Sequence, residues 1–563
     1  MRRQSILLTV LFLLANLASG CSSSISQLEG DNIPTAVILE PEATSTLPIS
    51  LDPRARTPIP EIVDGTLWIE PSIPAELQAQ LNIPAGFTQT EDQESATVRL
   101  EINGQRPVSY WLLAFVAPFP TTTDGITTQE LWSAWRGEYV EPLGGRRLRM
   151  DAETYNLLTA WWGPAGQEAV VTFPAEELLD QAWDDRPAWA IVPFAALEPR
   201  WKVLTIDDIS PVRKDFKQGT YSLSVPISVN GDRSDVAAFM AADGNDSGTP
   251  LLPPSNRDAD KLTTVALTGV TALVRATAWE LERKGITYAA TDIGEMLREA
   301  DITHISNEVP FDENCPPPKP KVDELIFCSD PKYIALLEEV GTDVIELTGD
   351  HFNDWGAEAT LYTIQMYKDR GWPYYGGGEN LEDGRGAVTF EHNGNRLAFI
   401  GCNAKGGGYA TASETRPGAV ECDFPWLEEE VERLVEAGYL PIFTFQHQEY
   451  YTFEPRPDQV EDFQRMAQAG AVIISGSQAH QAQGIEFFNG ATVMYGLGNL
   501  FFDQLGIYEN ASSALIARHV FYDGRHISTE LITITFVDYA RPRFATNEER
   551  IDLLNKVFEG SGW

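Results

Sequence analysis

Three histidines in the second half of the chain each follow an apolar, strand-like run. They are His351 in LTGDHFNDWG, His447 in FTFQHQEYY and His480 in SGSQAHQ, and the chain has only seven histidines in 563 residues. Ligands of open α/β sheets bind beyond the carboxyl ends of the strands, and imidazole and carboxylate groups are what a divalent metal needs. The pattern predicts a metal or phosphate site. Each histidine taken alone could instead be a hydrogen-bonded polar residue at a strand end.

The elements that must position these histidines alternate between strands and helices across residues 261–540. Strand, glycine-containing turn and helix repeat several times, which is typical of a layered α/β domain. The strand-like runs are TTVALTG, ADITHIS, DVIELTG, RLAFIG, PIFTFQ, AVIISG and ATVMYG. The helix-like runs are ALVRATAWELERKG, PKYIALLEEVG, AEATLYTIQMYKDRG and FPWLEEEVERLVEAG. Residues 541–563 follow as an amphipathic C-terminal tail.

A smaller α/β segment, residues 63–242, precedes this domain, and its alternating runs favour βαβ units. Within it, residues 189–228 resemble the hinge-side part of type II periplasmic solute-binding proteins of the phosphate- and molybdate-binding kind. The resemblance implies a binding-protein-like domain and leaves open whether that domain binds a ligand. The polar, Gly- and Pro-rich run DGNDSGTPLLPPSNRDAD separates the two domains.

The first 20 residues have the pattern of an export signal, with two arginines before the apolar run ILLTVLFLL. The run LASGC ending at Cys21 resembles a bacterial lipobox, which implies that Cys21 carries a lipid. An ordinary secretory signal is the alternative. Residues 21–62 are rich in Ser, Thr, Pro and acidic residues and predict a tether. We therefore expect a protein secreted across the cytoplasmic membrane and lipid-anchored on its outer face.

Besides Cys21 there are four cysteines: Cys315, Cys328, Cys402 and Cys422. An even number in an oxidising compartment favours disulfides over thiolate metal ligands, and no CxxC spacing is present. Of the three possible connectivities we predict Cys315 with Cys328 and Cys402 with Cys422. Each bond would stabilise the fold by about 3 kcal/mol through chain entropy.

Charge limits the partners of the chain. Asp and Glu number 82 against 41 Lys and Arg, which gives a formal net charge of −41. Such a surface repels nucleic acid and anionic head groups, so we expect no nucleic-acid partner and membrane contact through the lipid alone. An acidic polymer would bind only at a local basic patch. The simpler interpretation of the charge is solubility.

Seven segments between residues 263 and 504 resemble, in order, the motifs of the CapA (poly-gamma-glutamate capsule biosynthesis) family, whose fold is similar to calcineurin-like metallophosphatases. The resemblance implies an α/β protein with a layered, metallophosphatase-like C-terminal domain of CapA type, preceded by the smaller binding-protein-like domain. It also implies a role in handling a capsule or cell-envelope polymer of the polyglutamate type. The segments are VALTGVTALVRA, ADITHISNEVPF, ELTGDHFNDWG, YYGGGEN, TFQHQEYY, SGSQAHQAQGIEFFNG and YGLGNLFFDQ.

The resemblance also implies a site. Asp354 and Glu449 would orient ligands or act as general acid and base, and Glu308 would lie beside them. Imidazole and carboxamide ligands suit Mn, Zn or Fe better than Mg. The metal ligands implied are Asn307, Asp350, His351, His447 and His480.

Three positions depart from the family motifs. Val270 stands where the family has the Asp of its opening Gly-Asp, and Ser477 and Gln478 stand where it has paired histidines. One bound ion is therefore expected rather than two. The retained ligands favour a metal-dependent phosphoesterase or amide hydrolase. The losses favour a non-catalytic binding or scaffold lipoprotein with a degenerate metal site, and both hypotheses stay open.

Overall fold

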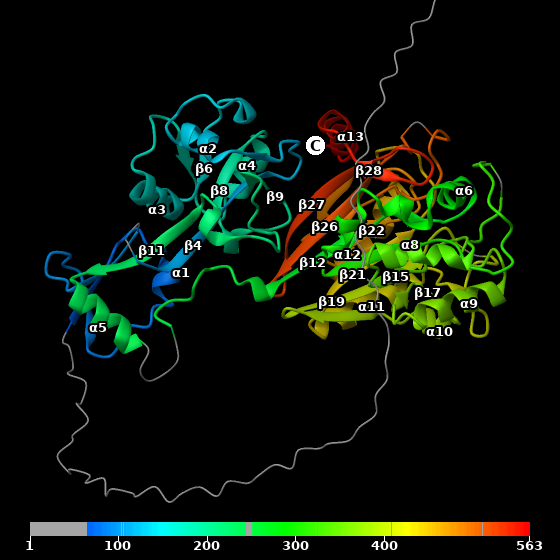
Figure 1. Ribbon diagram of the computed structural model, residues 1–563, viewed down its shortest axis with the longest axis horizontal. Helices are drawn as coiled ribbons and strands as arrows, with labels where there is room; N and C mark the ends of the chain where they lie inside the picture. Colours follow the sequence, from blue (N-terminus) through cyan, green and yellow to red (C-terminus); the bar gives the residue numbers. More distant parts are fainter. Residues whose placement is uncertain are drawn as a thin grey trace, which may run out of the picture. The chain divides into compact units, whose positions relative to one another are not determined.

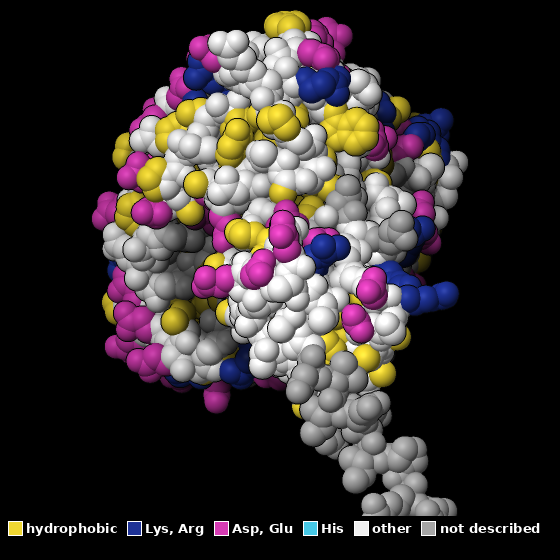
Figure 2. Space-filling view, turned by 90° about the vertical axis from the view of Figure 1, so that its left-hand side faces the viewer, with side chains coloured by type: hydrophobic (Ala, Val, Ile, Leu, Met, Phe, Trp, Pro, Cys, Tyr) yellow, Lys and Arg dark blue, Asp and Glu magenta, His cyan; other side chains and the backbone are white. Residues whose placement is uncertain are grey.

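The computed structural model describes residues 65–563 except residues 103, 105, 244–249, 324, 407 and 509. The predicted export signal, Cys21 and the tether lie outside the described residues. By its contacts the described chain belongs to one compact unit. No described helix is both long and apolar enough to cross a membrane. Asp and Glu side chains are scattered over the face shown in Figure 2, in keeping with the net charge.

The first part of the chain forms a nine-stranded sheet (Figure 1). Its long strands, β4 (Pro107–Pro118) and β11 (Ser224–Gly231), run antiparallel to each other through the middle of the sheet. They separate two groups of parallel strands at its ends. These are β1 (Gly65–Ile69), β2 (Phe87–Thr90) and β3 (Val98–Ile102) at one end, and β6 (Leu148–Met150), β7 (Val170–Thr172) and β8 (Trp189–Pro193) at the other, with β9 (Trp201–Val203) beside β4.

Local capping explains where the helices of this part begin. The Thr127 and Glu130 side chains form a capping box at the start of α2, and Asp151 accepts the Thr154 amide at the start of α3. The helices are α1 (Ala75–Gln78), α2 (Thr128–Trp135), α3 (Ala152–Trp162), α4 (Leu178–Asp184) and α5 (Arg233–Asp243). A two-stranded sheet pairs β5 (Gly125–Ile126) with β10 (Thr205–Ile206).

The rest of the chain contains two further large sheets. The strands of the first are β12 (Leu262–Leu267), β13 (Val270–Thr271), β14 (Ile302–Asn307), β15 (Val344–Glu346), β16 (Tyr374–Tyr375), β25 (Asn499–Phe501), β26 (Ser513–Tyr522), β27 (Arg525–Phe536) and β28 (Pro542–Phe544). Its order is β16-β15-β14-β12-β26-β27-β28, with β13 between β14 and β25. The shorter pair β17 (Gly377–Gly378) and β20 (Gly418–Ala419) stands apart.

The second sheet has the order β18-β19-β21-β22-β24-β23. Its bounds are β18 (Val388–His392), β19 (Asn395–Asn403), β21 (Leu440–Gln446), β22 (Ile473–Gly476), β23 (Ile485–Phe488) and β24 (Ala491–Met494). The helices of this part are α6 (Arg275–Lys284), α7 (Gly294–Arg298), α8 (Ile334–Glu339), α9 (Ala357–Lys368), α10 (Leu381–Gly384), α11 (Phe424–Glu436), α12 (Pro457–Ala469) and α13 (Asn547–Gly560).

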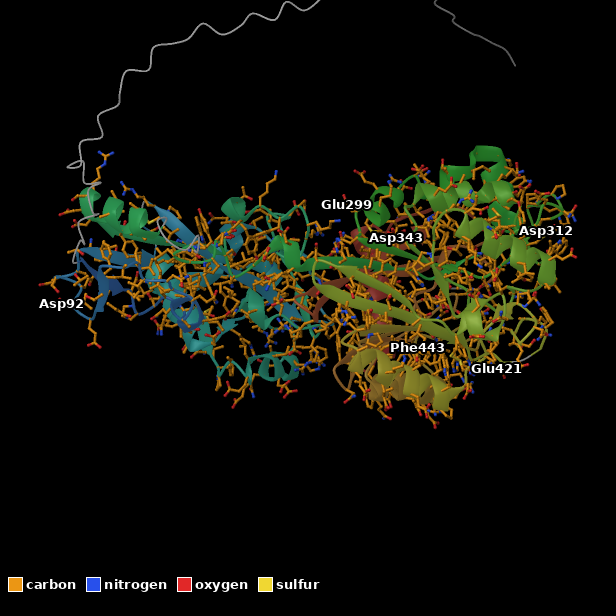
Figure 3. All side chains as sticks on the ribbon, turned by 90° about the horizontal axis from the view of Figure 1, so that it is seen from below. Asp92, Glu299, Asp312, Asp343, Glu421 and Phe443 are labelled. Carbon is orange, nitrogen blue, oxygen red and sulfur yellow. A yellow bond between two sulfur atoms is a disulfide. The ribbon has the colours of Figure 1, made fainter. Side chains whose placement is uncertain are left out.

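Three apolar cores stack these elements into layers, and Figure 3 shows the packed side chains around Phe443. One core lies between the two sheets and includes Leu267 of β12 and Phe399 of β19. Another joins the first sheet to α6, α8 and α9, and a third joins the second sheet to α11 and α12 through residues such as Phe463. Helix, sheet, sheet and helix therefore follow one another, which confirms the predicted layered α/β architecture.

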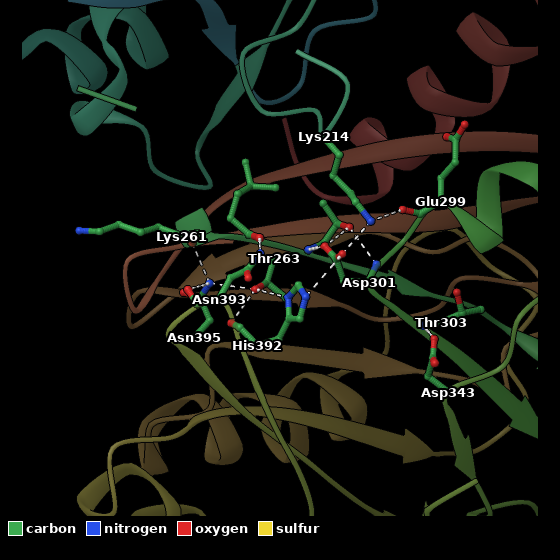
Figure 4. A network of polar contacts seen from close by, with 12 residues as sticks. Lys214, Lys261, Thr263, Glu299, Asp301, Thr303, Asp343, His392, Asn393 and Asn395 are labelled. Atoms are coloured by element: carbon green, nitrogen blue, oxygen red, sulfur yellow. Dashed lines mark hydrogen bonds and ion pairs between the residues drawn. The ribbon is translucent and has the colours of Figure 1, made fainter. Parts of the chain in front are cut away.

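A polar network holds the start of β12 in place (Figure 4). The Asp301 carboxylate accepts the Thr264 amide at 2.8 Å and pairs with the Lys214 ammonium at 2.7 Å. On the other side of the strand, the Thr263 hydroxyl donates to the His392 carbonyl at 2.9 Å. The first strand of this domain is thus fixed to both sheets and to the first part of the chain.

The β26–β27 hairpin brings together two histidines, the buried His519 and the half-buried His526, with Nδ1 of the first and Nε2 of the second 3.3 Å apart. His519 is fully buried, and burial holds its pKa well below the ordinary range. Burial likewise lowers the pKa of His526 to about 4. Both imidazoles therefore stay neutral in the folded chain under mildly acidic conditions.

This burial makes stability depend on pH. An unfolded histidine takes up a proton below about pH 6.5, so the unfolded state binds more protons than the folded one and stability falls as the pH falls. We expect His519 alone to lower the free energy of unfolding by about 2 kcal/mol between pH 7 and pH 5. Denaturant titrations at both pH values measure this, and His519→Gln should show a smaller pH dependence. An equal dependence in wild type and variant would contradict the prediction.

Candidate metal centre

The carboxyl ends of parallel strands in both sheets supply the site. β12, β14 and β15 run parallel in the first sheet, and β19, β21 and β22 run parallel in the second. Asn307 ends β14, and the segment that carries Asp350 follows β15. Gln446 ends β21, and Ser477 follows β22. Because these ends meet between the two sheets, residues far apart in the sequence come into contact.

Three side chains form the centre of the site. Ligand atoms of Glu308, Asp350 and His351 all lie within 4.8 Å of one another. Glu308 is buried, and its Oε2 atom has no hydrogen-bond partner among the described residues. Burial raises the pKa of Glu308 to about 7. Two carboxylates and an imidazole at this separation are a ligand set for one divalent ion.

Asn307 contributes a further free oxygen. Its Nδ2 donates to the Val309 carbonyl at 2.7 Å and to the Tyr367 hydroxyl at 2.8 Å. Both amide protons are thereby used, and Oδ1, fully buried, has no partner in the described part of the chain. A buried acceptor without a donor is costly unless something else binds it. The unpaired oxygens of Asn307 and Glu308 therefore fit a cation.

His351 is oriented by two contacts. Its Nδ1 lies 2.8 Å from Asp354 Oδ2, and its ring stacks on Phe327 with centroids 3.7 Å apart. Burial lowers the pKa of His351, but the Asp354 hydrogen bond and the nearby carboxylates outweigh it and raise the pKa to about 9. With Nδ1 held, Nε2 is the atom that faces Asp350, at 3.9 Å. Asp354 thus positions a histidine, as a carboxylate behind a metal ligand does.

The other two predicted histidine ligands are held differently. His447 Nε2 lies 3.0 Å from Asp462 of α12, and its buried Nδ1 has no partner among the described side chains. His480 Nδ1 lies 2.8 Å from Asn499 Oδ1, and its Nε2 lies 3.6 Å from Glu449. The structure thus places His480 with Glu449, and His447 with Asp462 and Phe463 of α12, and the group of Glu308, Asp350 and His351 includes neither histidine.

His480 has a left-handed backbone, with φ of 53°. A residue other than glycine costs on the order of 1–3 kcal/mol in such a conformation and persists where its surroundings hold it. Asn499 supplies this restraint, because its side chain contacts His480 Nδ1 and also donates to the His480 carbonyl at 3.2 Å. The conformation points the imidazole at Glu449.

Glu449 stays ionised. The hydrogen bond from His480 lowers its pKa to about 2, and burial opposes this only in part. Its Oε1 also accepts the Gln478 amide at 3.1 Å. A carboxylate with so low a pKa holds neighbouring groups in place at neutral pH rather than exchanging a proton.

The three residues that depart from the family motifs make other contacts in the structure. Val270 lies in a small apolar cluster with Ala272, Val274 and Phe502. The Ser477 hydroxyl donates to Gln446 Oε1 at 2.8 Å, and Gln446 Nε2 donates to Gln478 Oε1. Apolar packing and a chain of side-chain amides occupy the positions where the family motifs carry metal ligands.

Arg275 joins the two sides of the site through aromatic rings. Its guanidinium lies over Phe327 at 5.0 Å and over Phe502 at 4.9 Å. Phe327 stacks on His351, and Phe502 packs 5.2 Å from His480. The two site histidines thus rest on rings that share one buried cation.

Several residues of the site were not predicted from the sequence. Asp462 lies on α12 and Lys405 follows β19, in segments without a motif. Asn499 lies within the motif YGLGNLFFDQ, so its polarity in an apolar run was the available signal. Lys405 Nζ lies 2.6 Å from Asp350 Oδ2 and 3.8 Å from Glu449 Oε1.

Comparison with known proteins bears on this domain. Residues 264–504 match the family model described as "Bacterial capsule synthesis protein PGA_cap". The chain is 27% identical over 282 residues to the capsule biosynthesis protein CapA of Bacillus anthracis, covering 49% of this chain and 68% of that protein. It is 25% identical over 295 residues to the PGA biosynthesis protein CapA of Bacillus subtilis (strain 168), covering 51% and 74%. Among solved structures, a 5'-nucleotidase precursor from Thermus thermophilus aligns at 11% identity with a TM-score of 0.31, covering 54% and 58%.

Proposed function

Because residues 264–504 form a domain of the bacterial capsule synthesis family PGA_cap, we propose that this chain handles a capsule polymer of the poly-gamma-glutamate type outside the cytoplasm. We further propose that it does so as a hydrolase that uses one divalent ion. The observation that carries the proposal is the group of Glu308, Asp350 and His351, with the unpaired Asn307 oxygen beside it. A lipid on Cys21 would keep the protein at the outer face of the membrane.

The residues of the site fit one ion and have separate roles. Asn307, Glu308, Asp350 and His351 would hold it, and a divalent ion bound there supplies Lewis-acid polarisation of a carbonyl or phosphoryl oxygen. Asp354 holds the His351 ring so that Nε2 faces the site.

Asn499 holds His480 in the same manner, through Nδ1, and leaves Nε2 3.6 Å from Glu449. Imidazole is the side chain most often used as a general acid or base in hydrolysis. Asp354 thus positions His351 and Asn499 positions His480, and His480 would move a proton at Nε2, the atom that faces Glu449.

A non-catalytic binding protein is the alternative, and Val270, Ser477 and Gln478 favour it. These residues stand where the family motifs carry further metal ligands. A polymer could then bind to the same site without being cut. The first hypothesis requires metal, whereas the second does not.

Metal content separates the two. We expect the full chain, purified in detergent, to hold about one equivalent of Mn, Zn or Fe by elemental analysis. His351→Ala should lose it, because removal of a group at a metal site lowers affinity by about 10–100-fold or more. His392→Ala is the control, because this histidine is 39% exposed and bonds Thr263 away from the site. No metal in wild type, even after loading, would contradict the hydrolase proposal.

Polymer length gives the second readout. Metal-loaded protein is incubated with poly-gamma-glutamate, and the chain length is followed by gel filtration. Shortening that stops in His351→Ala supports hydrolysis. Binding with unchanged length in both proteins supports the alternative.

A further inference from the structure

Lys405 is placed in the site by the backbone around it. Its amide and that of Ala404 donate to the Gln446 carbonyl at 3.2 and 2.8 Å. Its own carbonyl accepts the Gln448 side chain at 3.1 Å. The Cys402–Cys422 disulfide lies three residues before it. Lys405 is therefore a fixed part of the site and not a surface side chain that happens to reach it.

The Lys405 ammonium lies between two carboxylates that come from different loops. It is 2.6 Å from Asp350 Oδ2 and 3.8 Å from Glu449 Oε1. Asp350 also belongs to the proposed one-ion cluster, and Glu449 pairs with His480. Asp350 therefore faces a candidate metal position on one side and an ammonium on the other.

The two carboxylates that face the ammonium, with the imidazole beside Glu449, would offer ligands to a metal ion in its place. Asp350, Glu449 and His480 offer two carboxylates and an imidazole, which suit Mn, Fe or Zn. Paired metal ions in hydrolytic sites lie about 3.5–4 Å apart, commonly with a group shared between them. Asp350 has the place of such a shared group here.

We propose that the Lys405 ammonium fills the second cation position of this site and excludes a second divalent ion. The inference rests on the proposed function, because it presumes that one ion binds at Glu308, Asp350 and His351. An ammonium at this position explains how the carboxylates of Glu308, Asp350 and Glu449 stay close together. It does so although Val270, Ser477 and Gln478 stand where the family motifs have metal ligands.

Metal stoichiometry tests the proposal with Mn2+ as the probe. Lys405→Met removes the charge and keeps a flexible chain of similar length, and Lys405→Arg keeps the charge. We expect one equivalent of Mn2+ in wild type and in Lys405→Arg, and two in Lys405→Met, by calorimetry and elemental analysis of the full chain. Electron paramagnetic resonance should then show a coupled Mn2+ pair only in Lys405→Met.

The outcomes are distinct. One equivalent in wild type and one in Lys405→Met, or two in wild type, would overturn the lysine inference and leave the proposed function standing. No metal in wild type would overturn the proposed function. Lys405→Met/Glu449→Gln should return to one equivalent, which locates the second ion at Glu449. If Lys405→Met folds only in the presence of Mn2+, a melting temperature that rises with Mn2+ well beyond that of wild type is the supporting result, and an equal rise is the opposing one.

Discussion

Asp503→Ala is expected to lower the free energy of unfolding by about 3–5 kcal/mol, because it leaves a buried guanidinium without a counter-charge. Asp503 is fully buried and Arg275 is 8% exposed. The carboxylate contacts Arg275 Nη2 at 2.5 Å and Nε at 3.3 Å, and accepts the Ala276 amide at 2.7 Å. The ion pair therefore joins the start of α6 to the segment after β25.

Two further variants make the result interpretable. Arg275→Met/Asp503→Leu removes both charges and should recover part of the loss, because no charge is left buried alone. Asp552→Ala breaks an exposed ion pair, in which the Asp552 side chain is 65% exposed and that of Lys556 44%. This change should lower the free energy of unfolding by less than about 1 kcal/mol. Denaturant titration measures all three. A loss for Asp503→Ala no larger than that for Asp552→Ala would show that the buried pair is not needed for stability.

Cys402→Ala/Cys422→Ala is expected to cost about 3 kcal/mol of folding free energy, mainly because the unfolded chain gains freedom. The structure forms both predicted disulfides, Cys315–Cys328 across 13 residues and Cys402–Cys422 across 20. The stabilisation that a disulfide provides rises only slowly with the number of residues in the loop that it closes. The two pairs should therefore contribute similar amounts to stability.

The second pair should also affect the site. Cys402 lies near the end of β19, three residues before Lys405, so its removal loosens the loop that carries the ammonium. Cys315→Ala/Cys328→Ala is the matched control for stability, and metal affinity is the readout that distinguishes the pairs. A cost below about 1 kcal/mol for both variants would contradict the entropy argument.

The fold was largely predictable because periodicity and turn chemistry reflect local packing. Runs such as PIFTFQ and AVIISG became β21 and β22, and the helical run FPWLEEEVERLVEAG became α11. The domain limits remain predictions, at residues 63–242 and 261–540. Whether the first domain binds a ligand also remains open. The lipid on Cys21, which lies outside the described residues, likewise remains a prediction.

A residue of the site was predictable only where it is of a type that binds metals and also follows the end of a strand. Asp350 and His351 satisfied both conditions, and the structure brings them together with Glu308. Lys405 and Asp462 satisfied neither, since a lysine in a loop and an aspartate on a helix are ordinary surface residues. Their roles depend on which loops meet between the sheets, and that is set by tertiary structure.

The pairing of β12 with β26 also decides when this domain can fold. Leu262 pairs with Tyr522 and Leu267 with Ala517, so one of the two neighbours of the first strand comes only from near the end of the chain. Contacts so distant in sequence slow folding and leave strand edges open to wrong partners in the meantime. A fragment that stops at residue 504, where the match to the capsule synthesis family ends, would leave that edge of β12 exposed for good. We therefore expect the polypeptide to remain dependent on chaperones until its last strands have been synthesised and paired.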